Sequence, residues 1–249
     1  MFKIKKTLYL LGFLLFSIAF KSADSYDQKK GAPGNKDVVR RIKAYLPSSP
    51  VIVEAGTYDG KDTVELSKLL PKAKIYTLEP IPELFSKSAT AIKNCANVRL
   101  YNKALSDQTG SAIMYTSEER NRPGITSQSS SLLAPKDHLK HAPNTLFKKK
   151  IEIDAITLDD WAQQNQIDHI DFLKLDIQGY ELNVLQASPK LFNTVKVILL
   201  EVEFVEAYKG QYLYADIKDW LENQGFELNC LYVNSWFGDA LFIRKNCKN

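Results

Sequence analysis

The sequence predicts an α/β fold in which helices cover both faces of a doubly wound, mostly parallel sheet. Two segments carry this prediction, residues 51–60 and 170–179, because each runs from apolar strand residues through an acid to a glycine that precedes a helical pattern. The end of the chain adds a third observation. Residues 226–233 and 240–244 alternate like an antiparallel hairpin across 234–239. Five strand–helix units and this hairpin predict a seven-stranded sheet.

The first strand, residues 51–53, is an uninterrupted β-branched run, which is typical of a strand buried on both faces of a parallel sheet. Two glycines follow it and allow the backbone to turn sharply and to approach a ligand closely. The helix predicted over residues 61–70 would present its free N–H groups to that ligand. An ordinary strand-to-helix turn would use the same glycines. We expect cofactor-binding residues in this turn: Glu54, Gly56, Thr57, Tyr58 and Gly60.

A second acid, Glu79, follows the next predicted strand at residues 74–78 and comes 25 residues after Glu54. In doubly wound folds a carboxylate at this place accepts hydrogen bonds from a ribose, so the pair indicates an adenosine-containing ligand. The turn lacks the G-x-G-x-x-G pattern of dinucleotide folds, and Asp59 would repel a phosphate. A cationic sulfonium fits better, and we therefore predict S-adenosyl-L-methionine as the cofactor.

The third and fourth strands, residues 98–101 and 172–175, also lead to acids. The turn after the third strand contains Ser106 and Asp107. These residues would either form hydrogen bonds with the polar edge of the adenine or belong to a plain β-turn. Because ligands collect outside the carboxyl ends of strands in open α/β sheets, we expect four acids to face one crevice. These are Glu54, Glu79, Asp107 and Asp176.

Ordered blocks of the sequence resemble the FkbM-type methyltransferases. They are residues 53–60, 78–80, 102–107, 130–132, 157–160 and 174–181, and the last of them, KLDIQGYE, is the most diagnostic. The resemblance covers about residues 51 to 243. It implies a class I, Rossmann-like methyltransferase fold with S-adenosyl-L-methionine. It also implies methyl transfer, usually to a hydroxyl of a sugar, glycan or small natural product.

The chain departs from the family pattern at three positions. Thr57 and Tyr58 stand in a first turn that usually reads Gly-Ala-Asn-x-Gly, and Gln178 stands where Glu is common. The glycines and the acids at the strand ends are kept, so we expect cofactor binding to be little affected and the pocket to be altered at Tyr58 and Gln178.

Transfer to a hydroxyl requires a general base. Asp176, at the end of the fourth strand, is the candidate, with Glu181 and Glu201 as alternates. A purely structural role for Asp176 is the competing interpretation, because Lys174 on that strand would be costly to bury without a partner such as Asp176 or Glu201. A divalent metal held by Asp176 and Glu201 is also conceivable, but we assign no metal ligand.

The chain divides into three segments. Residues 1–22 hold lysines before a 14-residue uncharged run, shorter than a membrane span, and predict a signal peptide or an N-terminal membrane anchor. Residues 23–36 read as a linker, and residues 37–249 as the methyltransferase domain. We expect a membrane-tethered or exported protein and leave a cytoplasmic-facing body open, because the methyl donor is made and held in the cytoplasm. The oligomeric state is not predicted.

Within that domain, about residues 118–148 have few periodic apolar residues and several prolines. Such a long loop in a compact domain is usually functional, and we expect a lid that covers the substrate. His138 and His141 in it are interpreted as exposed loop histidines rather than as metal ligands. Cys95, Cys230 and Cys247 lack a zinc-type spacing, and we expect free thiols, with a Cys230–Cys247 pair open for an exported chain.

Charge and composition limit the function classes. The net charge is +4, but the first 30 residues contain six lysines and two aspartates, and the remainder has 27 basic and 27 acidic residues. A neutral body argues against a nucleic-acid partner. Two other functions stay open, namely a catalytically inactive, exported or membrane-tethered binding module on the same fold and, less well supported, an NAD-dependent dehydrogenase.

Overall fold

The centre of the molecule is an eight-stranded, mostly parallel sheet with the order β1-β11-β12-β10-β9-β2-β3-β4. This computed structural model describes residues 26–247. The strands are β1 (Asp27–Lys30), β2 (Val51–Ala55), β3 (Lys74–Leu78), β4 (Val98–Tyr101), β9 (Phe172–Leu175), β10 (Val197–Glu203), β11 (Phe226–Asn234) and β12 (Phe237–Arg244). Only β12 runs against its neighbours β10 and β11. The prediction of a doubly wound sheet with a C-terminal antiparallel hairpin is confirmed.

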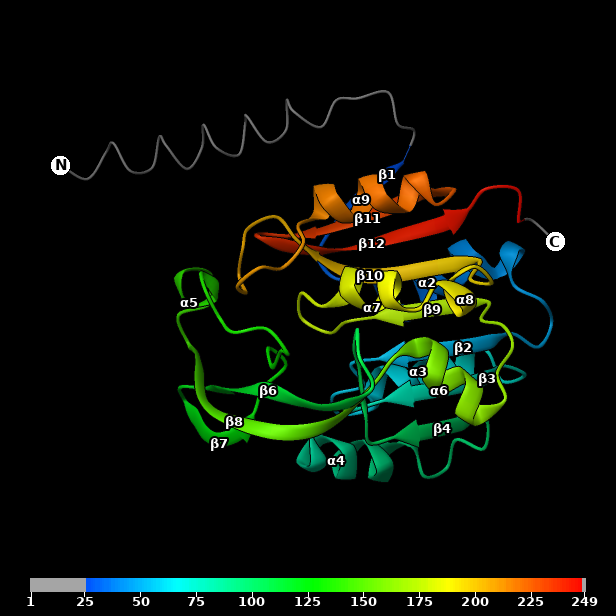
Figure 1. Cartoon of the computed structure of the whole chain (residues 1–249). Coiled ribbons are helices and arrows are strands. Elements are labelled where there is room, and N and C mark those ends of the chain that lie inside the picture. Colours follow the sequence, from blue (N-terminus) through cyan, green and yellow to red (C-terminus); the bar gives the residue numbers. More distant parts are fainter. Residues whose placement is uncertain (1–25, 248–249) are drawn as a thin grey trace, which may run out of the picture.

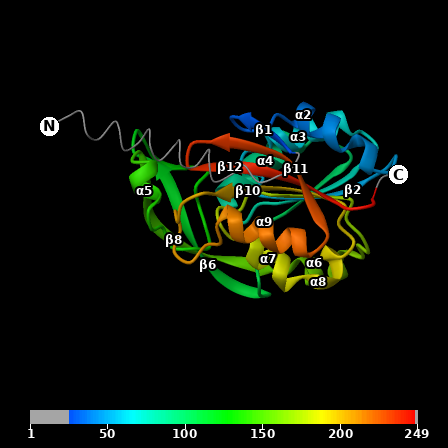
Figure 2. The same ribbon diagram turned by 90° about the horizontal axis from the view of Figure 1, so that it is seen from above.

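Helices cover both faces of this sheet (Figures 1 and 2). One face carries α2 (Asn35–Ile42), continued by the 3-10 turn η1 (Lys43–Tyr45), α3 (Lys61–Leu69) and α4 (Pro82–Ile92). The other carries α6 (Leu158–Asn165), α7 (Glu181–Ala187), α8 (Pro189–Phe192) and α9 (Tyr214–Asn223). Thr157 caps the start of α6, because its side chain accepts a hydrogen bond from the N–H of Asp160.

Two apolar cores lie on the two faces of the sheet, because successive strand residues point to opposite sides. Leu173 and Leu175 of β9 belong to the cluster that includes Trp161 of α6. Phe172 belongs to the other cluster, with Val38 of α2. Burial on both faces explains why β2, β9 and β10 are nearly continuous apolar runs in the sequence.

A second sheet, with the order β5-β8-β6-β7, lies on the side where the parallel strands end (Figure 1). It consists of β5 (Ala104–Leu105), β6 (Gly110–Glu119), β7 (Arg122–Thr126) and β8 (Thr145–Ile156), with the short helix α5 (His138–His141) between β7 and β8. The prediction of a loop over residues 118–148 is therefore wrong for about half of that segment, which contains the end of β6, β7, α5 and the start of β8. Residues 127–137 remain as the connection.

His138 is also not the exposed loop residue that the sequence indicated. It is 1% exposed, and its ring packs against Phe147, Tyr208 and Trp236 at centroid distances of 5.2 to 5.4 Å. Burial, followed by the neighbouring His141, lowers the pKa of His138 to about 4. A neutral imidazole suits this aromatic surrounding.

The linker predicted over residues 23–36 is wrong for β1, which is an extra edge strand paired in parallel with β11, and for Asn35, which begins α2. Ion pairs fix β1 to α2, from Lys29 to Asp37 at 2.6 Å and from Arg41 to Asp27 at 2.8 Å. The targeting segment, residues 1–22, lies outside the described residues and stays a prediction. Within residues 26–247, no helix is long and apolar enough to cross a membrane.

Candidate active site

A cleft of about 280 Å³ lies at the carboxyl ends of β2, β3 and β9, where the winding of the sheet changes direction. Ligands bind at this point in open α/β sheets. Five of the residues predicted to bind the cofactor line the cleft: Gly56, Thr57, Tyr58, Glu79 and Asp176. The cleft thus lies at the edge of the sheet where the sequence predicted the cofactor site.

Gly56 brings the turn after β2 against the end of β9. Its φ is 92°, and a Cβ added there would lie 1.9 Å from the carbonyl oxygen of Asp176. Only glycine allows this approach. The N–H of Asp176 in turn donates to the carbonyl of Ala55 at 3.0 Å, so the two strand ends hold each other in place. Gly60 has a different task, because it begins α3 close to Ser88 and Ala91 of α4 and does not line the cleft.

Glu79 is 4% exposed and points its carboxylate into the turn after β2. Its two oxygens accept the N–H groups of Tyr58 at 2.9 Å and of Ile81 at 3.0 Å. The side-chain amide of Asn102 donates to the carbonyl oxygens of Glu79 and Pro80 and fixes the turn behind it. A buried carboxylate held by two backbone donors at the cleft is suited to bind hydroxyl donors of a ribose.

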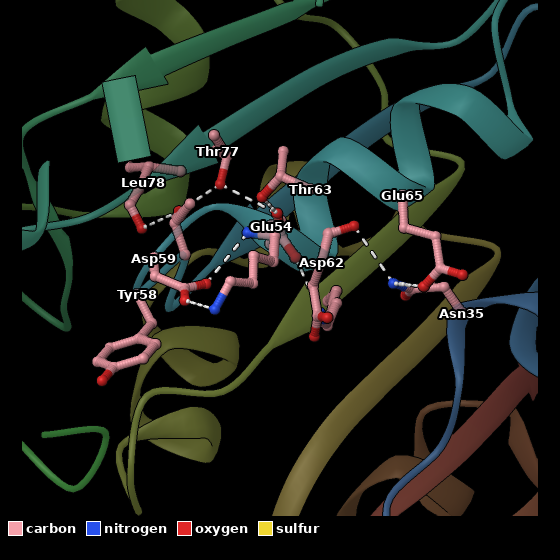
Figure 3. A network of polar contacts seen from close by, with 12 residues as sticks. Asn35, Glu54, Tyr58, Asp59, Asp62, Thr63, Glu65, Thr77 and Leu78 are labelled. Carbon is pink, nitrogen blue, oxygen red and sulfur yellow. Dashed lines mark hydrogen bonds and ion pairs between the residues drawn. The ribbon is translucent and has the colours of Figure 1, made fainter. Parts of the chain in front are cut away.

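Glu54 does not face the cleft, contrary to the prediction, and Lys174 does not pair with Asp176 or Glu201. The Lys174 ammonium lies 2.8 Å from Glu54 and 3.4 Å from the exposed Asp62. The register explains the pairing, because Glu54 lies directly opposite Lys174 in the ladder of β2 and β9. Thr63 and Thr77 donate further hydrogen bonds to Glu54, at 2.5 and 3.1 Å (Figure 3).

This pair is held by opposite charges against the cost of burial. Burial would raise the pKa of Glu54, but the Lys174 ammonium outweighs it and lowers that pKa. Burial would lower the pKa of Lys174, but Glu54 and then Asp62 outweigh it and raise that pKa. Thr57 is connected to this pair through Thr77, because the hydroxyl of Thr57 contacts the hydroxyl of Thr77. It also donates to the carbonyl of Leu78 at 3.0 Å.

Ser106 and Asp107 lie beside the cleft rather than in its lining. Ser106 is buried and donates its N–H to the carbonyl of Ile156. The carboxylate of Asp107 accepts the hydroxyl of Tyr180 at 2.9 Å and that of Ser106 at 3.2 Å. Residues 103–105, just before them, do line the cleft.

The three candidate bases occupy different places. Asp176 lines the cleft and accepts a hydrogen bond from the amide of Gln178 at 3.0 Å. Glu181 lies outside the lining, and its carboxylate accepts the N–H groups of Ile177 and Gly179 in the loop before its own helix. Glu201 is buried behind Gln178, which also donates to it. Asp176 is therefore the candidate base that reaches the cleft.

Burial raises the pKa of Asp176, although the Gln178 hydrogen bond and Lys174 oppose the shift. Burial raises the pKa of Glu201 well above its usual range, with further repulsion from Asp176 and Glu203. Both shifts favour holding a proton at the end of β9. This is the direction that a general base for a hydroxyl requires, since a higher pKa makes a stronger base.

Further residues that line the cleft come from segments to which the sequence assigned no cofactor role: Lys103, Met114, Ser127, Gln128 and Ser130. Met114 belongs to β6, and the last three lie in the connection after β7. The resemblance at residues 130–132 was the sequence signal for this wall. Its position could not be predicted, because it depends on the pairing of β6 with β8.

Charges in the cleft suit a cation. Glu79 and Asp176 bond to neutral groups, whereas each of the three lysines in the lining faces a carboxylate. Lys174 lies 2.8 Å from Glu54, Lys61 lies 2.6 Å from Asp59 and Lys103 lies 3.6 Å from Asp154. In the part of the chain that the structure describes, no group of three or more His, Cys, Asp and Glu could hold a metal ion. Cys95, Cys230 and Cys247 are free thiols.

The raised pKa values predict that the ligand-free protein becomes less stable as the pH rises. Burial first, and then Asp176, raises the pKa of Glu79 to about 7 and that of Asp239 to about 7. The folded state thus binds these protons more tightly than the unfolded state, so their contribution is complete below pH ~4.5 and is lost as the pH rises through ~7. For Glu79 alone the shift corresponds to roughly 3 kcal/mol.

We expect the urea concentration at the unfolding midpoint to decrease as the pH is raised from 5 to 8. In Glu79→Gln this dependence of the midpoint on pH should be weaker. The matched control is Glu83→Gln, an exposed acid in the first turn of α4, which should leave the slope as it is. A midpoint that rises over this interval would contradict the assigned burial effects.

The fold and the site define a class I methyltransferase that depends on S-adenosyl-L-methionine. The order β4-β3-β2-β9-β10-β12-β11 is the seven-stranded sheet of that class, and β1 is added at its edge. The family model described as "Methyltransferase FkbM domain" matches residues 54–228, and the chain belongs to this family. The predictions of family, fold class and cofactor are confirmed.

Two curated relatives are similar over most of the chain. The 2-O-methyltransferase NoeI of Sinorhizobium fredii is 27% identical over 94% of this chain and 96% of its own length. Methyltransferase sdnD of Sordaria araneosa is 24% identical over 74% and 76% of the two chains. Among solved structures, a SAM-dependent methyltransferase from Aquifex aeolicus matches with 14% identity and a TM-score of 0.44, over 84% of this chain and 88% of that one.

Proposed function

We propose that this protein is an O-methyltransferase that methylates a hydroxyl group of a sugar, a glycan or a small natural product. The observation that carries the proposal is the carboxylate of Asp176 in the cleft at the end of β9, with its pKa raised by burial. The similarity to a protein named 2-O-methyltransferase supports oxygen as the acceptor atom. Nitrogen acceptors that are neutral at working pH would need no such base.

When bound, the cofactor supplies an electrophilic methyl group on a sulfonium, which leaves as a neutral thioether. In this proposal, Glu79 binds the ribose hydroxyls with its carboxylate, and residues 103–105 border the adenine. Asp176 accepts the proton of the acceptor hydroxyl while the oxygen forms its bond to the methyl carbon. Holding the two reacting atoms in line supplies much of the acceleration.

The wall beyond Asp176 fits an acceptor rich in hydroxyl groups. Ser127, Gln128 and Ser130 bring hydroxyl and amide groups to the cleft, and Lys103 adds a cation. Such side chains donate and accept hydrogen bonds with sugar hydroxyls. The ring of Tyr58 also lines the cleft and adds an apolar surface.

The cofactor site is tested by calorimetric titration of S-adenosyl-L-methionine into the full chain and its Glu79→Ala variant. We expect binding to weaken about 100-fold in the variant, because two charge-assisted hydrogen bonds are lost. Glu83→Ala, which removes an exposed acid four residues along the chain, should bind like the wild type. Equal affinity of the Glu79→Ala variant would refute this cofactor site.

The acceptor class is tested with the wild-type protein and a panel of monosaccharides, oligosaccharides and phenols, with amines as the contrast. Turnover is read as release of S-adenosylhomocysteine, and the product as the mass of one added methyl group. O-methylated products would support the proposal. Methylation confined to amines would contradict it.

A further inference from the structure

Gln178 lies at the centre of a buried hydrogen-bond network beside the candidate base. Its side-chain amide nitrogen donates to Asp176 at 3.0 Å and to Glu201, and its amide oxygen accepts the hydroxyl of Tyr208 at 2.8 Å. The residue is 9% exposed and lines the cleft. A flipped amide would place its oxygen against two carboxylates, so these partners fix its orientation.

Tyr208 connects this amide to the segment after β7. It is fully buried, and its hydroxyl also lies 2.9 Å from the carbonyl oxygen of Ser129. Gly179 makes the close packing of the ring possible, because a Cβ there would lie 3.3 Å from Cδ2 of Tyr208 and 3.2 Å from Cβ of Gln211. The backbone of Tyr208 is held as well, since its N–H donates to the side chain of Gln211.

The segment that Tyr208 reaches is part of the cleft. Ser131 donates its hydroxyl to the carbonyl of Gln178 at 2.7 Å, and its backbone pairs with Tyr115 of β6. Ser130 on one side of Ser131 lines the cleft, and so do Ser127 and Gln128. Gln178 and Tyr208 therefore connect this segment, residues 127–131, to the carboxylate of Asp176.

We propose that Gln178 and Tyr208 are positioning residues that hold the acceptor-binding segment 127–131 at a fixed place relative to Asp176. This inference rests on the proposed function, in which Asp176 takes the proton and the segment binds the acceptor. The amide of Gln178 aims the carboxylate and separates it from Glu201, while Tyr208 and Ser131 hold the segment. A misplacement of about 1 Å between reacting groups costs about 100-fold in rate, which makes such a connection valuable.

The test compares Tyr208→Phe, which keeps the ring and removes the hydroxyl, with Tyr101→Phe. The control also removes one tyrosine hydrogen bond, to Asn165 at 2.8 Å, but at the end of β4 and outside the cleft lining. Hydrogen exchange of the amides of residues 129–133 is measured for both in the full chain. We expect exchange there to quicken about tenfold in Tyr208→Phe alone, while the amides of β9 and β10 keep wild-type rates.

Kinetics supply the second readout. In Tyr208→Phe we expect kcat/KM for the acceptor to fall about tenfold, with the KM for S-adenosyl-L-methionine within about twofold of wild type. Gln178→Leu removes the amide that donates to Asp176 and accepts from Tyr208, and we expect kcat to fall about 100-fold with the affinity for the cofactor retained. If the two residues only stabilised the core, the variants would not lower the kinetic parameters for the acceptor while leaving those for the cofactor unchanged.

Two results would overturn the inference. Either the exchange rates of residues 129–133 are unchanged in Tyr208→Phe, or the amides of β9 and β10 exchange faster by the same factor as residues 129–133. Failure of the proposed function looks different. In that case the wild-type protein methylates no hydroxyl acceptor in the panel, while the exchange difference between Tyr208→Phe and Tyr101→Phe persists.

Discussion

Replacing Asp176 by Asn is expected to lower kcat about 10²- to 10⁴-fold, the usual contribution of a general base. The amide has nearly the same shape, so the strand end and its contact with Gly56 should remain. The side-chain amide of the variant, however, cannot accept the proton of the acceptor hydroxyl. The affinity for S-adenosyl-L-methionine should weaken less than tenfold, because only one nearby negative charge is lost. Single-turnover rates and calorimetry separate the two effects.

The pH dependence of kcat/KM provides an independent check. Burial raises the pKa of Asp176, so the wild-type rate should rise with pH through a midpoint above that of an ordinary aspartate. This limb should disappear in Asp176→Asn. Glu181→Gln and Glu201→Gln are the comparison variants, since both groups lie outside the cleft lining. If Glu201→Gln loses more activity than Asp176→Asn, the assignment of the base to Asp176 is wrong.

The parts of the site that the sequence predicted follow local signals. Glu79 and Asp176 each end a short apolar strand, and parallel strands place such ends at one edge of the sheet. Gly56 was found for the right reason, because its turn needs a positive φ and a close backbone approach. These inferences need no knowledge of which strand pairs with which.

The residues whose positions the sequence predicted wrongly depend on pairings between segments that are distant in the chain. Glu54 also ends the first strand pattern, but the register of β2 and β9 places it against Lys174, 120 residues away, and turns it from the cleft. The β1 strand consists of Asp27, Gln28, Lys29 and Lys30, a polar edge strand without apolar alternation. Neither pairing is encoded in a local pattern.

The second sheet was missed for a similar reason. The strand β8 contains Lys148, Lys149 and Lys150, which interrupt the apolar alternation, and only its second half, Ile151 to Ile156, has the pattern of a strand. Its partner β6 supplies Met114 to the cleft, and the segment after β7 supplies the serines. The predicted lid is thus partly paired into the second sheet, and our proposal assigns substrate selection to residues 127–131 in the connection after β7.

Replacing Lys174 by Met is expected to lower the free energy of unfolding by about 3–5 kcal/mol, because Glu54 would be left buried without its cation. Asp62 contributes little to this loss, since its side chain is 71% exposed and its attraction is screened. Urea unfolding at pH 7 measures the change. Lys140→Met, which removes an ion pair with Asp137 on a lysine that is 71% exposed, is the control and should cost at most about 1 kcal/mol.

The double variant Glu54→Gln with Lys174→Met decides whether the pair or the lysine itself stabilises the fold. The neutral amide that Glu54→Gln introduces still accepts the hydroxyls of Thr63 and Thr77, so we expect the double variant to recover most of the lost stability. A double variant as unstable as Lys174→Met would show that the lysine stem, and not the ion pair, holds β9 against α3.

The sign of the pH effect gives a second criterion for the same pair. The lowered pKa of Glu54 means that its contribution in the wild type is present above pH ~4.5 and is lost as the pH falls. In Lys174→Met the buried carboxyl prefers its proton, because burial is no longer opposed by the ammonium. That variant should therefore gain stability on acidification from pH 7 to pH 5, by more than the wild type does. An equal gain in both proteins would mean that Lys174 does not set the ionisation of Glu54.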